Sequence, residues 1–414
     1  MEINPAVDVD VIRSCKMKRR YIVFGVAAFS ALSMKAQRTD TAFKKEKLNK
    51  TEVAILYGQY IQDGNNSAVT GGIGTEKLTV YAPGFVIKKS LNKNTYGLKG
   101  GVDMISSAST DNIDYVVSSA SKKDARTYAG LDFTHELNDK LVLSAGTGFS
   151  IESDYTSLQV NAGVSSGKKE QTWSWSVDMQ FIFDDLRYGR LKAGFKKPYY
   201  LIYASELRYR DWYDDYLRRS YNLKLGLSRV INKRMILGLY PEVDYQHGLL
   251  ATPFHRVYFT DNSLKPENLP DDRFKAFLGI KANYFAGSNT ILKNSIDLYA
   301  DNFGILGMAI ENETAFKLNY LLSLSPSLRF YHQQGAKYFS PYQQHLPGEL
   351  FYTSDYDLSR FNSFKAGMGL RYSPLKRSGR FTFNEVQLRY AWYRRSNGLN
   401  AHIISFLFSG DRKG

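Results

Sequence analysis

The sequence predicts an all-β chain that folds as a transmembrane, antiparallel, up-and-down β-barrel of about sixteen strands, with fourteen as the next choice. Three observations support this fold class. Apolar and polar residues alternate over most of the chain, the alternating segments are long, and the connections between them are short and long in turn. An even number of strands is expected because it brings the N-terminus and the C-terminus of the barrel to the same side of the membrane.

The alternation has a period of two, begins near Thr51, and is clearest over residues 141–149, 221–228, 364–372 and 385–392. In each of these segments one face is apolar and the other carries glycine, hydroxyl groups or full charges, as in strands whose two faces meet different surroundings. A soluble antiparallel sandwich also alternates, so the periodicity alone leaves both architectures open.

The lengths of the segments favour the barrel. They run to about ten to fourteen residues, whereas a tilted strand needs roughly nine to eleven to cross a bilayer and ordinary strands average about five or six. Two prolines, Pro241 and Pro326, lie inside expected strands, where proline is disfavoured except at ends and bulges. The expected strands cover residues 51–62, 76–91, 95–106, 124–137, 140–152, 155–165, 171–183, 219–231, 235–246, 273–286, 290–302, 306–318, 322–334, 361–373, 381–393 and 400–408.

The connections alternate in length along the chain. Short periplasmic turns and long external loops are the rule in outer-membrane barrels, so this asymmetry is the second argument against a sandwich. The tight connections are at residues 91–94, 138–139, 232–233, 287–289 and 376–379, and the long ones cover 62–75, 106–123, 184–218, 248–273 and 335–360.

The N-terminus has the layout of a secretory signal peptide. Residues 16–20 (KMKRR) form a positive segment, 21–32 an apolar core, and 33–36 a cleavage region. We therefore expect residues 1–36 to comprise an upstream extension and the signal, and residues 37–50 to form a short N-terminal periplasmic segment.

The barrel itself is expected over residues 51–408, followed by a C-terminal tail at 409–414. Its last strand alternates in polarity and ends at Phe408, an aromatic residue of the kind that the outer-membrane insertion machinery recognises. Aromatic residues at segment ends, including Trp173, Trp175 and Tyr393, fit the girdles that mark the two membrane interfaces.

The net charge of the chain bears on whether the protein binds nucleic acid. The chain has 55 lysines and arginines against 40 acidic residues, a formal charge of +15. Clustered cations bind phosphate backbones. Here the basic residues are scattered along strands and loops, so we expect no nucleic-acid partner and ascribe the excess to anionic lipid headgroups or solutes.

The single cysteine, Cys15, precedes the apolar core of the signal, so the expected mature chain contains none. Disulfides, thiolate metal sites and thiol nucleophiles are thereby excluded from it. No catalytic, cofactor-binding or metal-binding residue is assigned from the sequence, and no cofactor is expected.

If the apolar stripe of each strand faces lipid, the opposite stripe faces the lumen. This stripe carries both signs of charge, which suits either a hydrated pore or a network of paired charges that fills a closed barrel. The candidate lumen-facing residues are Asp132, Lys224, Glu242, Asp244, Lys281, Arg329, Lys365, Arg371, Glu385 and Arg389, together with Glu311 and Glu313.

Signals for other chemistry are weaker. Asp111, Asp114 and Asp124 lie in a serine-rich loop that lacks the ligand spacing of a calcium loop, so a solvated loop is favoured. The histidines are scattered, and the nearest acid and imidazole, Asp244 and His247, have no hydroxyl placed beside them. The protein is therefore expected not to be an enzyme.

Residues 67–83 (SAVTGGIGTEKLTVYAP), 101–127 and 128–138 together resemble an uncharacterised outer-membrane barrel family of Bacteroidota-type bacteria, a domain of unknown function. The likeness continues through residues 321–331 to the end of the last strand. It implies a barrel often encoded near a thioredoxin-like protein, a small lipoprotein and a flavin transferase, and hence a part in an envelope redox or secretion system. It supplies no catalytic residues.

These observations predict a barrel of the cell outer membrane that is exported by its signal peptide. It is expected to act as a channel or as the membrane anchor of an envelope complex. The family resemblance implies that this complex has a redox role. Its expected partners are outer-membrane lipid, the barrel-insertion machinery and a periplasmic protein or lipoprotein. The alternatives are an outer-membrane hydrolase and a secreted, soluble β-sandwich binding protein.

Overall fold

The structure is a computed structural model and describes residues 49–107, 123–152, 156–167, 172–186, 217–252, 255–374 and 376–413. Of the signal peptide and N-terminal segment expected over residues 1–50, residues 1–48 lie outside this part of the chain, whereas Asn49 and Lys50 belong to the first strand. Asp111 and Asp114 of the serine-rich loop lie outside it as well.

One antiparallel sheet makes up the wall of the molecule. It contains 17 strands, of which the three-residue β17 (Lys376–Ser378) is confined to a turn, and the other sixteen are long. The long strands are β1 (Asn49–Asp63), β2 (Leu78–Leu91), β3 (Asn94–Ser107), β4 (Lys123–Asn138), β5 (Leu141–Ile151), β6 (Thr156–Ser166), β7 (Trp173–Asp185), β8 (Leu217–Asn232), β9 (Met235–Gly248), β12 (Asp272–Ala286), β13 (Thr290–Asp301), β14 (Leu306–Lys317), β15 (Leu322–Gln333), β16 (Phe361–Tyr372), β18 (Phe381–Arg395) and β19 (Asn400–Lys413).

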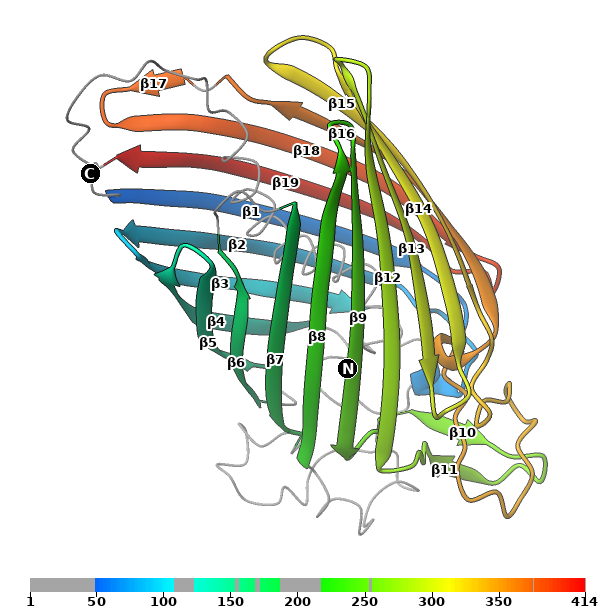
Figure 1. The fold of residues 1–414 in the computed structure, drawn as a ribbon. Coiled ribbons are helices and arrows are strands. Elements are labelled where there is room, and N and C mark those ends of the chain that lie inside the picture. The colour runs from blue at the N-terminus through cyan, green and yellow to red at the C-terminus, as the bar shows by residue number, and fades with distance from the viewer. Residues whose placement is uncertain are drawn as a thin grey trace, which may run out of the picture.

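The sheet closes on itself. β1 pairs with β2 on one side and with β19 on the other. β9 pairs directly with β12, because β10 and β11 form a separate small sheet. The result is a closed cylinder (Figure 1). A sandwich would need two separate sheets, so the prediction of a sixteen-stranded up-and-down barrel is confirmed and the sandwich is excluded.

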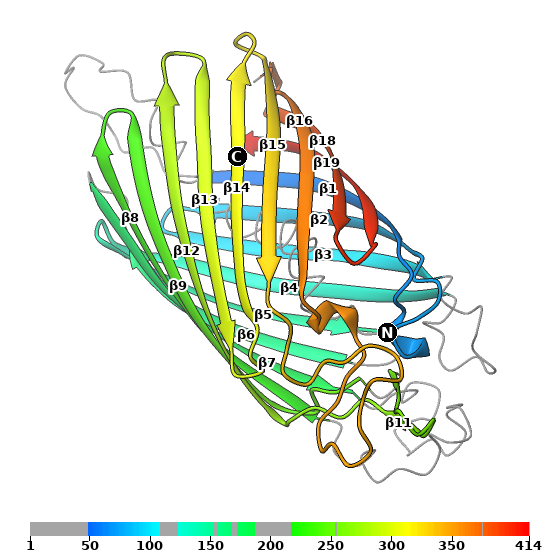
Figure 2. The ribbon, with the colours of Figure 1, turned by 90° about the vertical axis from the view of Figure 1, so that its right-hand side faces the viewer.

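The two ends of the barrel differ. At one end, where β1 begins and β19 ends, successive strands are joined by short turns such as 92–93, 139–140 and 233–234. At the opposite end lie the long connections 249–271 and 334–360, visible at the bottom of Figure 2. These short turns and two long connections are as predicted, but β13 and β14, and likewise β18 and β19, are joined at the same end by the short connections 302–305 and 396–399.

The last strand is longer than expected. β19 continues beyond Phe408 to Lys413, and its final residues pair with the start of β1, for example Ser409 with Ala54 and Arg412 with Thr51. The described part of the expected tail therefore belongs to the wall. The polar side chains after Phe408 predict the end of the strand when only the sequence pattern is considered. Backbone hydrogen bonding to β1 nevertheless keeps these residues in the strand.

Pro241 and Pro326 do lie within strands, and the ladder accommodates each on one side only. Pro241 is paired with Leu278 of β12, whereas pairing of β9 with β8 is interrupted at Pro241 and resumes in the same register. Pro326 is paired with Met368 of β16, and the interruption falls toward β14. Because proline has no N–H to donate, each strand loses a few backbone pairings to one neighbour, and the register on either side of the gap stays the same.

The exposed surface of the wall is apolar. Leu131 is 58% exposed, Phe149 50% and Leu388 50%, and Trp173 and Trp175 are exposed near the short-turn end. Tyr393 is an exception to the predicted girdle, because it is only 4% exposed and its hydroxyl accepts a hydrogen bond from Arg395 Nε at 2.8 Å. Its position on the charged face of β18 accounts for this.

Among the described residues no helix is long and apolar enough to cross a membrane. The helices of this part of the chain are the single turns η1 (Ala68–Thr70) and η5 (Tyr356–Leu358).

The two long connections, residues 249–271 and 334–360, fold against each other, and we call them the loop layer. They contain the hairpin β10 (Arg256–Tyr258) and β11 (Leu264–Pro266) and are joined by a bridge between Asn268 and Tyr352. The layer has buried residues of its own, and it lies at one end of the wall (Figure 2). The core residues are Ala251, Val257, Phe259, Leu269, Ala336, Tyr352 and Leu358, with Phe303 and Ile305 from the adjoining turn.

Candidate functional site

The ten candidate lumen-facing residues all lie on the strand face opposite the exposed apolar side chains. Asp132, for example, lies between Leu131 and Phe133, which are 58% and 39% exposed. On β18, Arg389 lies between Leu388 and Tyr390 in the same way. Alternation along a strand sends successive side chains to opposite faces, so these charges share one face of the wall.

Strand register brings opposite charges directly across from one another. Lys224 on β8 is opposite Glu242 on β9, and its Nζ lies 2.6 Å from Glu242 Oε2. Lys275 on β12 is opposite Asp244 on β9, with Nζ 3.3 Å from Asp244 Oδ2. Cross-strand pairs of opposite charge stabilise a sheet, whereas like charges in the same positions would weaken it.

Where like charges do meet, an acid lies beside them. Arg329 on β15 is opposite Lys365 on β16, and Glu311 on β14 lies next in line. Glu311 Oε2 is 3.9 Å from Arg329 Nε and 4.0 Å from Lys365 Nζ. One carboxylate thus offsets the repulsion between two cations.

Further pairs involve the other candidates. Lys99 Nζ lies 2.9 Å from Asp132 Oδ2, and the Nε of Arg371 donates to Glu385. Lys281 Nζ lies 5.3 Å from the centre of the Tyr240 ring, within the range of a cation–π contact.

One contact identifies the concave face. Arg389 Nη1 on β18 donates to Glu313 Oε2 on β14 at 2.6 Å, although β15 and β16 lie between these two strands. Glu313 also accepts from Lys293 Nζ at 2.8 Å. Side chains on strands that are not neighbours can meet only where the wall curves toward them, so we infer that the charged face is the inner face.

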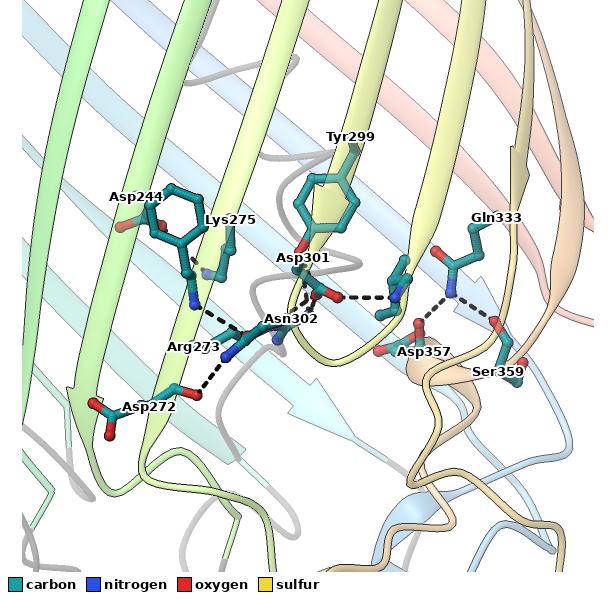
Figure 3. Close-up of polar contacts among 12 residues, drawn as sticks. Asp244, Asp272, Arg273, Lys275, Tyr299, Asp301, Asn302, Gln333, Asp357 and Ser359 are labelled. Atoms are coloured by element: carbon teal, nitrogen blue, oxygen red, sulfur yellow. Dashed lines mark hydrogen bonds and ion pairs between the residues drawn. The ribbon is translucent and has the colours of Figure 1, made fainter.

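A second polar group stands where β12 and β13 meet the long-connection end. Asp301 Oδ2 accepts hydrogen bonds from Arg273 Nη2 and from the Tyr299 hydroxyl, both at 2.6 Å (Figure 3). Its other oxygen accepts from the backbone N–H of Ile305 at 2.9 Å. The Asp301 side chain is fully buried, so this group fixes the turn that carries Phe303 and Ile305 into the core of the loop layer.

The loop layer is fastened to the wall at other points as well. Gln333 Nε2, at the end of β15, donates to the backbone oxygens of Asp357 at 2.8 Å and of Ser359 at 2.6 Å (Figure 3). Arg395, at the end of β18, lies with Nη1 2.5 Å from Asp357 Oδ1. These side chains were not predicted as site residues, because nothing in the sequence relates a strand end to a loop residue far along the chain.

A third group lies inside the loop layer and unites His255, Glu267 and Asp355. The three side chains are buried, and one ligand atom of each lies within 4.8 Å of the others. Burial by itself lowers the pKa of His255, but the nearby carboxylates of Glu267 and Asp355 outweigh it and raise the pKa to about 8. Among the described residues this is the group whose ligand types and separations suit a metal ion.

The acid and imidazole that are nearest in the sequence do not form a pair. Asp244 bonds to Lys275 on the inner face, whereas His247 Nδ1 lies 2.8 Å from Asp272 Oδ1 on the exposed face. The Tyr245 hydroxyl donates to the same Asp272 oxygen at 2.5 Å. Asp244 and His247 are therefore on opposite sides of the wall.

Fold and site together define a class: closed, sixteen-stranded antiparallel barrels whose wall has one exposed apolar face and one face of paired charges, with a folded layer at one end. Comparison with protein families specifies the family. Residues 22–403 match the model described as "Protein of unknown function (DUF3570)", and the chain belongs to this family. The predicted resemblance to an uncharacterised domain family is thereby confirmed.

Solved structures with a similar arrangement include several outer-membrane proteins. The outer membrane protein OpdK from Pseudomonas aeruginosa is 9% identical, with a TM-score of 0.40 over 88% of this chain and 98% of that chain. A BenF-like porin from Pseudomonas fluorescens is 7% identical, with a TM-score of 0.42 over 87% and 98%. A bacterial polysaccharide outer membrane secretin is 7% identical, with a TM-score of 0.45 over 88% and 98%. No curated protein matches the sequence.

Proposed function

We propose that this protein spans the outer membrane of a Gram-negative cell and forms a channel for small hydrophilic solutes, without catalysing a reaction. The exposed apolar band supports the first part. Leucine, valine and aromatic side chains that are half exposed on a closed wall would face water in a soluble protein, whereas in a bilayer they meet lipid tails.

The observation that carries the channel proposal is the combination of sixteen strands with a charged inner face. Barrels of about eight strands are filled by their own side chains, whereas those of about sixteen to eighteen leave an aqueous passage. Several inner-face charges remain accessible: the side chains of Asp132, Lys99 and Arg371 are 42%, 35% and 53% exposed. Charges that water reaches set the ion preference of a pore.

Export and orientation belong to the same proposal. The signal peptide expected within residues 1–36 would carry the chain across the inner membrane, and the insertion machinery would recognise the C-terminal strand. The short-turn end, where β1 begins and β19 ends, would then face the periplasm and the loop layer would face outward. Outer-membrane lipid is the immediate partner.

Conductance in planar lipid bilayers tests the channel. Purified, refolded protein should give discrete conductance steps, and Arg371→Glu should shift the reversal potential in a salt gradient toward cation selectivity. Lys376→Glu makes the same change of charge in the turn that contains β17, and serves as the matched control. Equal shifts for both variants would show that the inner face does not select the ions.

An electrically silent barrel would favour the anchor instead. In that case the folded protein should copurify from outer membranes with a periplasmic protein or lipoprotein, and the redox link implied by the family resemblance predicts a thioredoxin-like or flavin-bearing partner. Turnover of lipid or peptide by the pure barrel, abolished by replacing one serine or histidine, would favour the hydrolase.

A further inference from the structure

The group in the loop layer is built by a short hairpin. Arg256 on β10 is paired with Pro266 on β11, and the ladder continues one step further because the Glu267 N–H donates to the His255 carbonyl oxygen at 2.9 Å. This pairing places His255 and Glu267 side by side. Asp355 comes from the second long connection, just before η5.

Hydrogen bonds hold both carboxylates in place. Glu267 Oε1 accepts from the Thr353 hydroxyl at 2.5 Å, and Asp355 Oδ1 accepts from the Asp357 N–H at 2.9 Å. Glu267 Oε2 accepts from the Thr252 N–H at 2.6 Å. Such contacts fix the orientation of carboxylates in the way that outer-shell groups do around bound metals.

The imidazole of His255 is the exception. The residue is only 8% exposed, and its Nδ1 is fully enclosed and has no hydrogen-bond partner. A buried ring nitrogen without a partner is costly in a finished fold. Nδ1 points between the two carboxylates, 3.6 Å from Glu267 Oε2 and 3.7 Å from Asp355 Oδ2.

These separations are too long for hydrogen bonds, which join nitrogen and oxygen at about 2.7–3.2 Å. They suit a shared ion better. Two ligand atoms bound at about 2.1 Å to a tetrahedral cation lie about 3.4 Å apart. Nδ1 is thus within a few tenths of an ångström of this separation from each carboxylate, and the three ligand atoms all lie within 4.8 Å of one another.

The structure assigns His255, Glu267 and Asp355 as the ligands of one divalent cation of the zinc type, held between the two long connections. Imidazole nitrogen and carboxylate oxygen are both ligands that Zn²⁺ takes in proteins. Ca²⁺ takes about six to eight oxygen ligands and rarely accepts nitrogen, so it fits less well. The two carboxylates balance the charge of the ion, and water would occupy a fourth position.

The site would act as a clasp for the loop layer. Its ligands lie 12 and 88 residues apart in the sequence, from positions 255, 267 and 355, so a bound ion would tie the second connection to the first. The inference is independent of whether the barrel conducts.

Zinc binding to the full-length, refolded barrel tests the assignment. After removal of metals with a chelator, we expect one Zn²⁺ per chain by isothermal titration calorimetry, and a cobalt-loaded sample should show the visible absorption of a four- or five-coordinate ion. Glu267→Gln should weaken zinc binding by at least about tenfold. Heat-dependent gel mobility establishes that each variant retains the barrel.

His247→Asn is the matched control, because it removes an exposed histidine that is also paired with a carboxylate. It should leave zinc affinity unchanged. If His255→Asn does not reach the heat-modifiable form, Glu267→Gln and the cobalt spectrum of the unaltered protein decide the question. Zinc uptake that is equal in the unaltered protein and in Glu267→Gln, or absent from both, would overturn the proposal.

Discussion

The wall and the loop layer are built on different principles, although they belong to one chain. In the wall, side chains alternate between the exposed apolar face and the charged face, and each of the sixteen long strands is paired with a neighbour on both sides. The loop layer has little sheet and resembles a small soluble domain, with fully buried side chains such as Val257 and Phe259 at its centre. At the proposed location in the outer membrane, the wall would depend on lipid, whereas the layer depends on packing.

The largest effect that tests this distinction is expected from a cavity-forming substitution in the core of the loop layer. Phe259 is fully buried and packs edge-on against Tyr352, with ring centres 4.9 Å apart. Phe259→Ala should destabilise the layer by about 3–5 kcal/mol. We expect faster proteolysis within residues 249–271 and 334–360, with unchanged heat-dependent mobility of the barrel.

Leu350→Ala is the control for this experiment, because Leu350 belongs to the same layer but is 70% exposed. It should leave proteolysis unchanged. Loss of the heat-modifiable form in Phe259→Ala would show that layer and wall fold as one unit, contrary to the distinction drawn above.

A charge on the outer face should affect the wall and spare the layer. Leu131 lies near the middle of β4 and is 58% exposed, so Leu131→Arg would place a cation in the bilayer core at a cost of about 2–4 kcal/mol. The folded fraction in lipid vesicles should fall along a urea titration. Leu131→Phe, which stays apolar, should fold like the unaltered protein, and equal stability of the two variants would contradict a lipid-facing position.

The smallest of these effects is expected at the junction. Asp301→Asn removes the charge that Arg273 and the Tyr299 hydroxyl share, and leaving such buried groups poorly paired costs about 1–3 kcal/mol. Thermal unfolding of the barrel and proteolysis of the layer should both shift. Asp261→Asn, in an exposed turn of the layer, should shift neither measurement, and a shift of only one measurement by Asp301→Asn would show that the junction does not couple the two regions.

The sequence predicts the wall well because each strand carries its own evidence. Alternation, segment length and turn spacing are local signals, and they locate all sixteen long strands to within a few residues. The two strands with internal prolines form as predicted, since the missing N–H interrupts pairing on one side only. The end of β19 was missed because its last residues are held by β1, a partner at the other end of the sequence.

The loop layer could not be predicted in the same way. His255 and Asp355 have no sequence pattern that relates them, because the distance between them is set by the packing of two irregular connections. The pairing of Arg389 with Glu313 depends likewise on the curvature of the wall across two intervening strands. Charge on one face follows from alternation, but the choice of partner follows from three-dimensional register.

The seam between β1 and β19 also constrains how the molecule is made. It places Lys50 opposite Lys413, so the last pairing of the cylinder has to wait until nearly the whole chain has been delivered. Contacts between such distant segments form slowly, and until then both edge strands present unpaired backbone groups that invite aggregation. Both edges therefore stay open until the seam forms, so the stage just before closure is the one at which the chain is most exposed to aggregation.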